Sequence, residues 1–487
     1  QLILAHHPQD CLNCIRNKNC ELQALAEEYA IRENPFELMV RGLPQDTSTP
    51  SIVRDPDKCI LCRRCEYACS EFQSVNALGL EKRGNHAMIV PSLGKDLMES
   101  PCVMCGQCIH ACPVGAIHEN EEIDKFLAAV ADPDKIVVTQ MAPAVRVAIG
   151  EEVGMQTGDM DMNVLVTALR QIGFDYVLHT NFTADLTILE EGNELLKRVK
   201  EGGKLPMFTS CSPGWINFCE TYYPDLLDNL STCKSPQQMF GALVKTYWAE
   251  KMGIDPSKIY SVSIMPCTAK KFEAARPEMN SSGYRDVDLV LTTRELGRLF
   301  RMTGLDFSKI APGKFDSWMG AYTGAAVIFG ATGGVMEAAL RTVYEVVTGN
   351  ELKDVNFTFA RGMEGIKEAE IDLNGLKVRV AIAHGLANAR KVMDQVRAGE
   401  SPYHFIEIMA CPGGCIGGGG QPITKSNAKR AERIEGIYKE DAGLPLRKSH
   451  ENPEVKQIYE EFLHEPLGHK SHELLHTHYH DKNKKFL

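Results

Sequence analysis

The chain has 487 residues, of which 44% are hydrophobic, and a formal net charge of −11. This length can accommodate one large catalytic domain together with smaller modules. The acidic balance and the lack of a basic run argue against nucleic acid and anionic membranes as partners. The sequence shows neither a signal peptide nor a membrane-spanning stretch, so we expect a cytoplasmic location. The longest uncharged stretch, Gly320 to Met336, predicts a tightly packed internal helix.

Cysteine is the most informative residue type. The chain has 17 cysteines, and eleven of them precede residue 113. A disulfide framework is typical of small secreted domains, whereas this chain is large and its cysteines occur in regular short spacings. We therefore expect metal ligation in a reducing compartment.

The first cysteine group is His7-x3-Cys11-x2-Cys14-x5-Cys20. Three cysteines and a histidine could hold either zinc or a 4Fe–4S cluster, and by spacing alone zinc is favoured. His6 is an alternative to His7 as the histidine ligand. A helical pattern follows from Glu21 to Ile31.

Two runs of four cysteines follow, each with the spacing Cys-x2-Cys-x2-Cys-x3-Cys. This is the bacterial two-cluster ferredoxin pattern, in which the fourth cysteine of each run ligates the other cluster. The second run ends in the usual proline, Pro113, whereas the first has Ser70 at that place. We predict one 4Fe–4S cluster on Cys59, Cys62, Cys65 and Cys112, and another on Cys69, Cys102, Cys105 and Cys108.

The remainder of the chain alternates between short apolar runs and amphipathic helices such as Asn163–Gln171 and Asp185–Lys200. This alternation predicts an α/β domain with a largely parallel sheet and helices on both faces. The expected strands are Lys135–Thr139, Asp175–Leu178, Leu205–Thr209, Ile259–Ile264, Val287–Leu291, Val378–Ala383 and His404–Ile408.

Four further cysteines follow expected strands. Cys211 and Cys267 each lie in a loop directly after one strand, and Cys411 and Cys415 lie in a glycine-rich loop after another. Ligands of such sheets bind outside the carboxyl ends of the strands, so the three loops can converge on one buried centre. The other two cysteines, Cys219 and Cys233, have no such context and are expected to be buried thiols.

Three motifs, in order, resemble those of iron–iron (FeFe) hydrogenase catalytic subunits. They are Phe208-Thr-Ser-Cys-Ser-Pro-Gly-Trp215, Met265-Pro-Cys-Thr-Ala-Lys-Lys-Phe-Glu273 and Glu407-Ile-Met-Ala-Cys-Pro-Gly-Gly-Cys-Ile-Gly-Gly-Gly-Gly-Gln-Pro422. The resemblance covers essentially the whole chain and is to the clostridial type, without the N-terminal 2Fe–2S domain of many relatives. It implies a multidomain α+β and α/β protein. Its parts would be a small helical iron–sulfur module (residues 1–50), a ferredoxin-like module (51–124) and a large α/β hydrogenase domain with twisted sheets flanked by helices (125–487).

The resemblance further implies an H-cluster, a 4Fe–4S cubane joined through one cysteine sulfur to a di-iron unit with carbonyl, cyanide and azadithiolate ligands. By motif position Cys415 bridges the two parts, Cys267 and Cys411 hold the cubane, and Lys270 donates to a cyanide. The first cysteine group becomes a third accessory 4Fe–4S site, with His7 as a ligand. The residues implied to cradle the cofactor are Ala142, Pro143, Met265, Pro266, Phe329 and Met409.

A proton route is indicated in part by the residues themselves. Glu191, Glu194 and Arg198 share one face of an expected helix, and this pattern alone favours a solvated face with an ion pair. The resemblance instead implies a relay through Cys211, Glu191, Ser231, Glu194 and Arg198. A thiol suits the innermost place because its pKa lies near neutrality.

One position departs from the family pattern. Two adjacent cysteines are usual, the first relaying protons and the second ligating the cubane, but here the second is Ser212. Serine binds iron only as an alkoxide, which is harder and more basic than a thiolate. We favour Ser212 as the fourth ligand. Ligation by Cys211, or by an unusual fourth ligand, remains open.

The implied function is reversible reduction of protons to H2, with electrons exchanged with ferredoxin. The alternatives are a subunit of an NAD(P)-linked assembly with flavin subunits, and a hydrogen sensor or iron–sulfur scaffold without turnover. The presence of Cys211, Lys270 and Cys415 favours turnover, and such a cofactor also implies maturation proteins as partners. The histidine-rich tail, His469 to His480, is expected to be a solvated segment without a metal.

Overall fold

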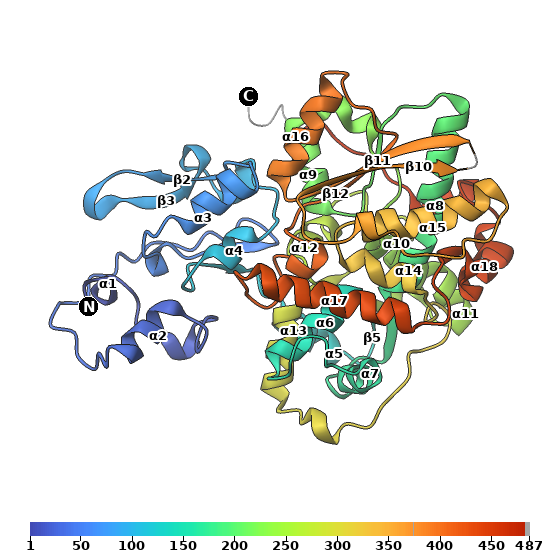
Figure 1. The fold of residues 1–487 in the computed structure, drawn as a ribbon. Helices are drawn as coiled ribbons and strands as arrows, with labels where there is room; N and C mark the ends of the chain where they lie inside the picture. Colours follow the sequence, from blue (N-terminus) through green and yellow to red (C-terminus); the bar gives the residue numbers. More distant parts are fainter. Residues whose placement is uncertain (374, 483–487) are drawn as a thin grey trace.

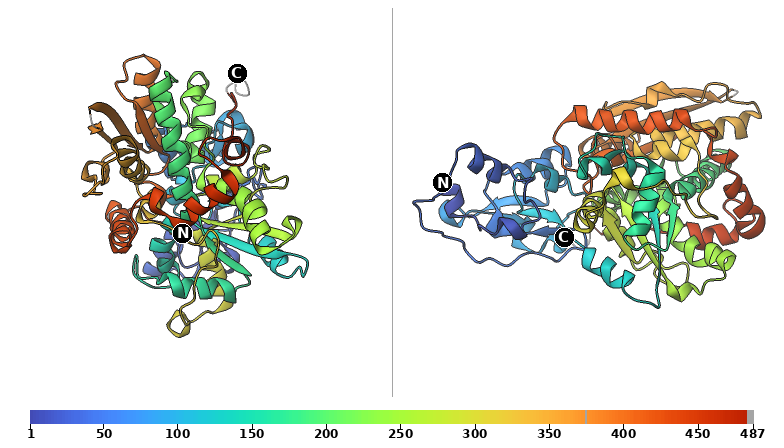
Figure 2. Two further views of the ribbon diagram at one scale, coloured as in Figure 1. Left: turned by 90° about the vertical axis from the view of Figure 1, so that its right-hand side faces the viewer. Right: turned by 90° about the horizontal axis from the view of Figure 1, so that it is seen from below.

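The computed structural model describes residues 1–373 and 375–482. The first part of the chain lies at one end of the molecule, and the remainder forms a larger α/β body (Figure 1). Figure 2 shows the same division from two further sides. No helix in the described ranges is both long enough and apolar enough to cross a membrane.

The ferredoxin-like part is built from short elements around the cysteine runs. β1 (Ile52–Arg54) pairs antiparallel with β4 (Ile117–Glu119), and β2 (Leu78–Glu81) pairs antiparallel with β3 (Met88–Pro91). The cysteine runs continue into the short helices α3 (Arg64–Tyr67) and α4 (Gln107–Ala111). Ahead of them lie α1 (Leu2–Ala5) and α2 (Glu21–Glu28), so the helix expected from Glu21 ends three residues early.

The first large sheet is wholly parallel, in the order β6-β5-β8-β9. The predicted parallel α/β arrangement is therefore confirmed, with each of these strands ending one or two residues beyond its expected end. Their interiors are fully buried, which explains their near-continuous apolar sequences. The strands are β5 (Ile136–Met141), β6 (Tyr176–His179), β8 (Ile259–Met265) and β9 (Leu289–Thr292).

The second large sheet has the order β10-β11-β12-β7. β11 (Leu376–His384), β12 (Phe405–Met409) and β7 (Met207–Phe208) run parallel, whereas β10 (Ile366–Leu373) pairs antiparallel with β11 as an edge strand. The sequence reading missed β10. Its charged side chains alternate with apolar ones along a half-exposed edge and give no buried-strand pattern.

Helices surround both sheets, and the longest, α8 (Thr180–Glu201), begins five residues earlier than expected. The single helix expected from Gly320 to Met336 is wrong. The stretch contains α14 (Gly324–Val327), a turn and the start of α15 (Gly334–Thr348), and the left-handed Gly333 separates the two. The other helices of this body are α5 (Ile123–Val130), α6 (Pro143–Glu152), α7 (Met162–Gln171), α9 (Pro213–Tyr222), α10 (Pro236–Leu243), α11 (Ala249–Met252), α12 (Ala269–Ala274), α13 (Thr293–Thr303) and α16 (Leu386–Arg397).

The C-terminal part wraps over the large body as α17 (Asn427–Gly443), α18 (Pro453–Ile458) and α19 (His469–Leu475). The expectation of a solvated tail is wrong for much of this segment. Leu474 and Leu475 enter the apolar core, and His476 is only 7% exposed. The only apolar side chains of α19 are the adjacent Leu474 and Leu475, so the sequence of this short helix gives no amphipathic pattern.

Candidate active site

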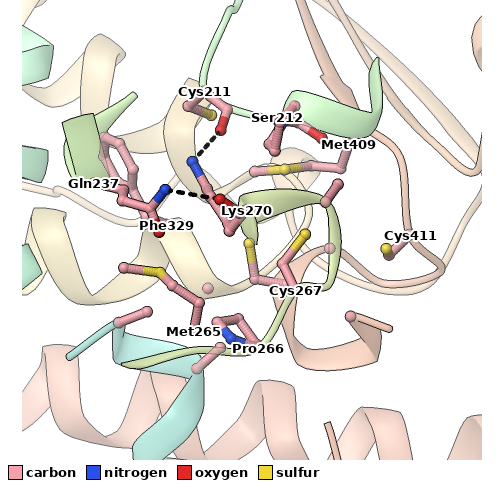
Figure 3. A pocket seen from close by; sticks show the side chains of 18 of the residues that line it. Cys211, Ser212, Gln237, Met265, Pro266, Cys267, Lys270, Phe329, Met409 and Cys411 are labelled. Atoms are coloured by element: carbon pink, nitrogen blue, oxygen red, sulfur yellow. Dashed lines mark hydrogen bonds between the residues drawn. The ribbon is translucent and has the colours of Figure 1, made fainter. Parts of the chain in front are cut away.

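The three cysteine loops meet at the carboxyl ends of strands, as expected for a parallel sheet. Cys211 lies between β7 and α9, Cys267 between β8 and α12, and Cys411 directly after β12. All of them line one buried cavity together with Cys415, which begins a 3-10 turn (Cys415–Gly417). Figure 3 shows Cys211, Cys267 and Cys411 around this space.

Glycines let the backbones of these loops approach closely. A Cβ on Gly418 would lie 2.1 Å from the carbonyl oxygen of Pro266, and one on Gly419 would lie 2.4 Å from that of Cys105. The left-handed Gly414 lies similarly close to the backbone of Thr332. The loop after β12 therefore contacts both the loop after β8 and the ferredoxin-like part through bare backbone.

Several buried thiols close together are the second feature of the cavity. Burial raises the pKa of Cys415 to about 12, and burial followed by the neighbouring Cys267 and Cys415 raises that of Cys411 further. Burial also raises the pKa of Cys267. Several thiols packed together in this way are characteristic of a metal centre, where the metal charge stabilises the thiolates.

Lys270 is held at the cavity by its own neighbours. Its ammonium Nζ donates to the carboxylate of Glu273 at 2.9 Å and to the backbone carbonyl of Cys211 at 3.1 Å. Gln237 donates to both the backbone carbonyl of Lys270 and the Glu273 carboxylate. The sequence reading did not assign roles to Glu273 and Gln237. The i, i+3 spacing from Lys270 to Glu273 on α12 was the available signal.

The remaining cavity wall is mainly apolar. Ala142 and Pro143 lie where β5 passes into α6, and Met265 and Pro266 lie at the end of β8. The other apolar side chains predicted for the wall are also there, namely Phe329 and Met409. The structure thus brings together all the residues expected around the cofactor.

A buried chain of polar groups leads away from Cys211. Glu191 is 2% exposed and Glu194 is 7% exposed, so the interpretation of this helix face as solvated is wrong. The Ser231 hydroxyl donates to the Glu194 carboxylate at 2.8 Å, and Arg198 donates to it at 2.6 Å. The expected i, i+4 ion pair is present, but on a buried face.

Glu191 occupies the middle of this chain. Burial, followed by repulsion from Glu194, raises its pKa to about 8. Neither carboxylate oxygen has a hydrogen-bond partner among the described residues. On the other side, burial and then Glu191 raise the pKa of Cys211 well above its ordinary value. Burial thus places the pKa of this thiol above the near-neutral range expected from the sequence.

Comparisons with known proteins agree with this geometry. Residues 135–419 match the family described as "Iron only hydrogenase large subunit, C-terminal domain". The chain belongs to the iron-only (FeFe) hydrogenases. It is a catalytic subunit of an enzyme that acts on H2. Further matches are to "Iron hydrogenase small subunit" (residues 427–482), "4Fe-4S dicluster domain" (58–116) and "NADH-ubiquinone oxidoreductase-G iron-sulfur binding region" (1–35).

Individual relatives span nearly the whole hydrogenase. The "NADP-reducing hydrogenase subunit HndD" of Solidesulfovibrio fructosivorans is 49% identical over 98% of this chain and 83% of the relative. "Iron hydrogenase 1" of Clostridium pasteurianum is 42% identical over 98% of this chain and 84% of the relative. The structure of a variant of the apo [FeFe]-hydrogenase HydA1 from Chlamydomonas reinhardtii has a TM-score of 0.66 and 46% identity, and the match covers 74% of this chain and 98% of that one.

The hydrogenase carries its ferredoxin-like cysteines around two separate cavities. These hold the two sets predicted from sequence. One cavity is lined by Cys59, Cys62, Cys65 and Cys112, and the other by Cys69, Cys102, Cys105 and Cys108. The backbone N–H of Ala77 donates to Cys69 Sγ at 3.3 Å, the kind of contact that tunes iron–sulfur clusters.

The first cysteine group is more open. Burial raises the pKa of Cys11, and the neighbouring thiols of Cys14 and Cys20 raise it further. The three cysteines therefore lie close together. His7 is buried and its Nδ1 has no hydrogen-bond partner among the described residues, whereas His6 is exposed. This arrangement fits His7 better than His6 as the histidine ligand.

Ser212 lies in the active-site cavity as the residue before α9. Its hydroxyl accepts a hydrogen bond of 3.3 Å from the backbone N–H of Ala410, beside Cys411. Cys211 instead adjoins Glu191 and Lys270, as described above. Ser212 therefore lies nearer to the β12 loop, which carries two of the expected cubane ligands.

Proposed function

We propose that this hydrogenase catalyses the reversible reduction of two protons to H2 and exchanges electrons through three accessory 4Fe–4S clusters. The observation that carries the proposal is the buried cavity in which Cys267, Cys411 and Cys415 converge with an anchored lysine, and which Cys211 also lines. The donor set fits an H-cluster: Cys267, Cys411, Cys415 and Ser212 would hold the cubane, and Cys415 would also bridge to the di-iron unit.

The protein supplies few bonds to a di-iron unit and must fix it by packing and hydrogen bonds. When bound, that unit supplies the centre at which the H–H bond is formed or cleaved. Lys270, aligned by Glu273, offers a cation to an anionic ligand, and the apolar wall excludes water. Gly414 and Gly418 allow the loops around the cavity to approach more closely than residues with side chains would.

Protons would travel between the cavity and the surface along the buried chain. Because burial keeps the Cys211 thiol neutral, we propose that it accepts one proton as it gives up another. Glu191 would receive that proton, since its raised pKa lets it change protonation state near neutral pH. Ser231 and Glu194 would continue the route, and Arg198 would hold Glu194 in place near the surface.

The test is an infrared spectrum of anaerobically matured protein in the carbonyl and cyanide stretching region, followed by an H2 assay. Sharp bands with H2 turnover are expected. Cys211→Ala should keep the bands and lose turnover, and Cys219→Ala, at a buried thiol outside the cavity, should keep both. Absence of bands while the accessory clusters are intact would refute the proposal.

A second candidate function is a catalytic subunit of an NAD(P)-linked assembly. It is favoured by the 49% identity to a relative whose printed name is an NADP-reducing hydrogenase subunit. The accessory cysteines lie in the N-terminal part, where Leu12 and Tyr29 are exposed apolar side chains available to a partner. Reduction of ferredoxin by H2 with the chain alone would support the main proposal. Reduction of NADP⁺ only after a flavin subunit co-purifies would support the second.

A further inference from the structure

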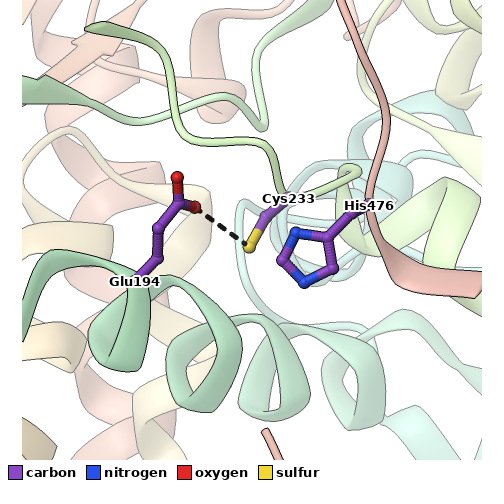
Figure 4. A group of neighbouring side chains, drawn as sticks. All are labelled: Glu194, Cys233 and His476. Atoms are coloured by element: carbon purple, nitrogen blue, oxygen red, sulfur yellow. Dashed lines mark hydrogen bonds between the residues drawn. The ribbon is translucent and has the colours of Figure 1, made fainter. Parts of the chain in front are cut away.

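A second group of metal-binding side chains lies beside the outer end of the polar chain. Glu194 comes from α8, Cys233 from the loop before α10, and His476 follows α19. One ligand atom from each lies within 4.8 Å of the others, and all three residues are buried. Figure 4 shows the Cys233 sulfur between the Glu194 carboxylate and the His476 ring.

His476 is already oriented as a metal ligand would be. Its Nε2 contacts the carboxylate of Glu190 at 3.1 Å, and its Nδ1 contacts the Thr232 hydroxyl at 2.8 Å. Because a carboxylate accepts hydrogen bonds, the neutral ring places its proton on Nε2, and its Nδ1 lone pair accepts the Thr232 hydroxyl proton. A metal bound at Nδ1 would take the place of that hydroxyl proton. Metal-binding histidines commonly have such a carboxylate behind them, which fixes the tautomer and raises ligand basicity.

Glu190 is in turn fixed by two further donors. The Tyr459 hydroxyl donates to it at 2.5 Å, and the backbone N–H of Leu467 donates to it at 2.8 Å. Both come from the C-terminal segment that also carries His476. The ring is therefore held by a preformed shell rather than by a mobile surface side chain.

Three acidic side chains lie around the group. Glu190, Glu191 and Glu194 are all buried on α8, and burial followed by these carboxylates raises the pKa of Cys233 well above its ordinary value. Arg198 already pairs with Glu194. A divalent cation would stabilise both the buried carboxylates and the thiolate form of Cys233.

We propose that Glu194, Cys233 and His476 bind a divalent cation of the zinc class, and that the bound ion blocks proton transfer through Glu194. Carboxylate, thiolate and imidazole together form a donor set that zinc accepts, with water or Thr232 able to complete four-coordination. On binding, Cys233 changes from thiol to thiolate and releases its proton to solvent, so the charges balance. The blocking part rests on the proposed relay, whereas the binding part does not.

The site joins two segments of the chain. Glu194 and Cys233 lie in the part that matches the large subunit, and His476 lies in the part that matches the small subunit. The C-terminal segment thus completes the site, and neither segment alone contains all three donors.

Binding is tested on the holoenzyme with zinc alone. X-ray absorption at the zinc edge is expected to show one sulfur ligand at about 2.3 Å together with nitrogen and oxygen ligands. Cys233→Ser and His476→Gln should each lose the bound zinc, while Cys219→Ser, at another buried thiol, should retain it. Glu190→Gln should weaken binding by about 10- to 100-fold, because only the histidine's partner is changed. A zinc spectrum without sulfur, or equal binding by parent and Cys233→Ser, would overturn the proposal.

Blocking is tested by H2 turnover as zinc is added, with each variant compared with its own activity without zinc and with iron content monitored. Inhibition that a chelator reverses is expected in the parent and in Cys219→Ser, and its loss is expected in Cys233→Ser. If zinc binds through sulfur without slowing turnover, the relay role of Glu194 is wrong while the metal site stands. If Glu194→Gln slows turnover but no zinc binds, the relay stands and the metal site is wrong.

Discussion

Glu191→Gln tests the proton route most directly. The parent carboxyl is almost fully buried, and burial with repulsion from Glu194 gives it a pKa of about 8. Glutamine keeps the size of the side chain but cannot exchange a proton at any ordinary pH. Because positioned acids and bases contribute about 10²- to 10⁴-fold to rates, we expect turnover to fall by that order.

The same carboxyl affects stability with a definite sign. Its folded-state pKa lies above the unfolded value of about 4.3, so the folded protein holds a proton that the unfolded chain has lost. Stability is therefore unaffected below the unfolded pKa and falls as pH rises toward 8. The free energy of unfolding is lowered by roughly 3 to 4 kcal/mol at pH 7, and the loss approaches about 5 kcal/mol above pH 8. Glu191→Gln removes this pH dependence, although its buried amide adds a constant cost.

The assay compares thermal unfolding of parent and variant from pH 5 to 9. The variant should gain stability relative to the parent as pH rises, and an infrared titration should show the parent's carboxylic acid band disappearing near pH 8. Glu201→Gln, at an exposed carboxylate on the same helix, is the matched control and should show neither effect. A stability difference that is constant with pH, or unchanged turnover, would refute the reasoning.

Three further outcomes are expected. Cys211→Ser keeps a proton-carrying group of similar size but one less readily deprotonated, so turnover should fall less than in Cys211→Ala; equal losses measured by H2 production would contradict a relay through this group. Ser212→Cys replaces a hard alkoxide with a thiolate and should raise the cubane's reduction potential, measured by redox titration with electron paramagnetic resonance; an unchanged potential would show that Ser212 is not a ligand. Gly418→Ala places a Cβ 2.1 Å from the Pro266 carbonyl and should prevent H-cluster incorporation, seen as lost infrared bands, while Gly79→Ala, with open space around it, should not.

The buried strands and the cysteine sets were predictable because each rests on a local pattern. The buried strands β5 and β8 are continuous apolar runs, and cysteine spacing alone divided Cys59 from Cys69 into the two cavities. What depends on long-range packing was not predictable. The burial of Glu191 arises from elements distant in the sequence, and the same packing displaced the pKa of Cys211 from the expected range.

The C-terminal segment is the clearest example. From sequence, His476 is one histidine among many in a polar tail, and Cys233 is a lone thiol. The two residues are 243 positions apart in the sequence, and the packing of α19 against the core brings them together. The partners that hold Lys270 were also missed, although Glu273 lies only three residues beyond it. A single i, i+3 pair of opposite charges is equally common on solvated helices, so it does not by itself indicate a buried contact.

The bare-backbone contact between Gly419 and the Cys105 loop lies where the proposed electron route would enter the active site. Electron tunnelling weakens exponentially with distance, and Cys105 belongs to one cavity's cysteine set while also lining the active-site cavity. Gly106 lies against Gly419, and a Cβ on it would also be only 2.5 Å from the Thr268 hydroxyl. Any side chain at either glycine would act as a spacer and lengthen the path. If electrons follow this proposed route, Gly106 and Gly419 keep the two cysteine-lined cavities as close together as the backbone allows.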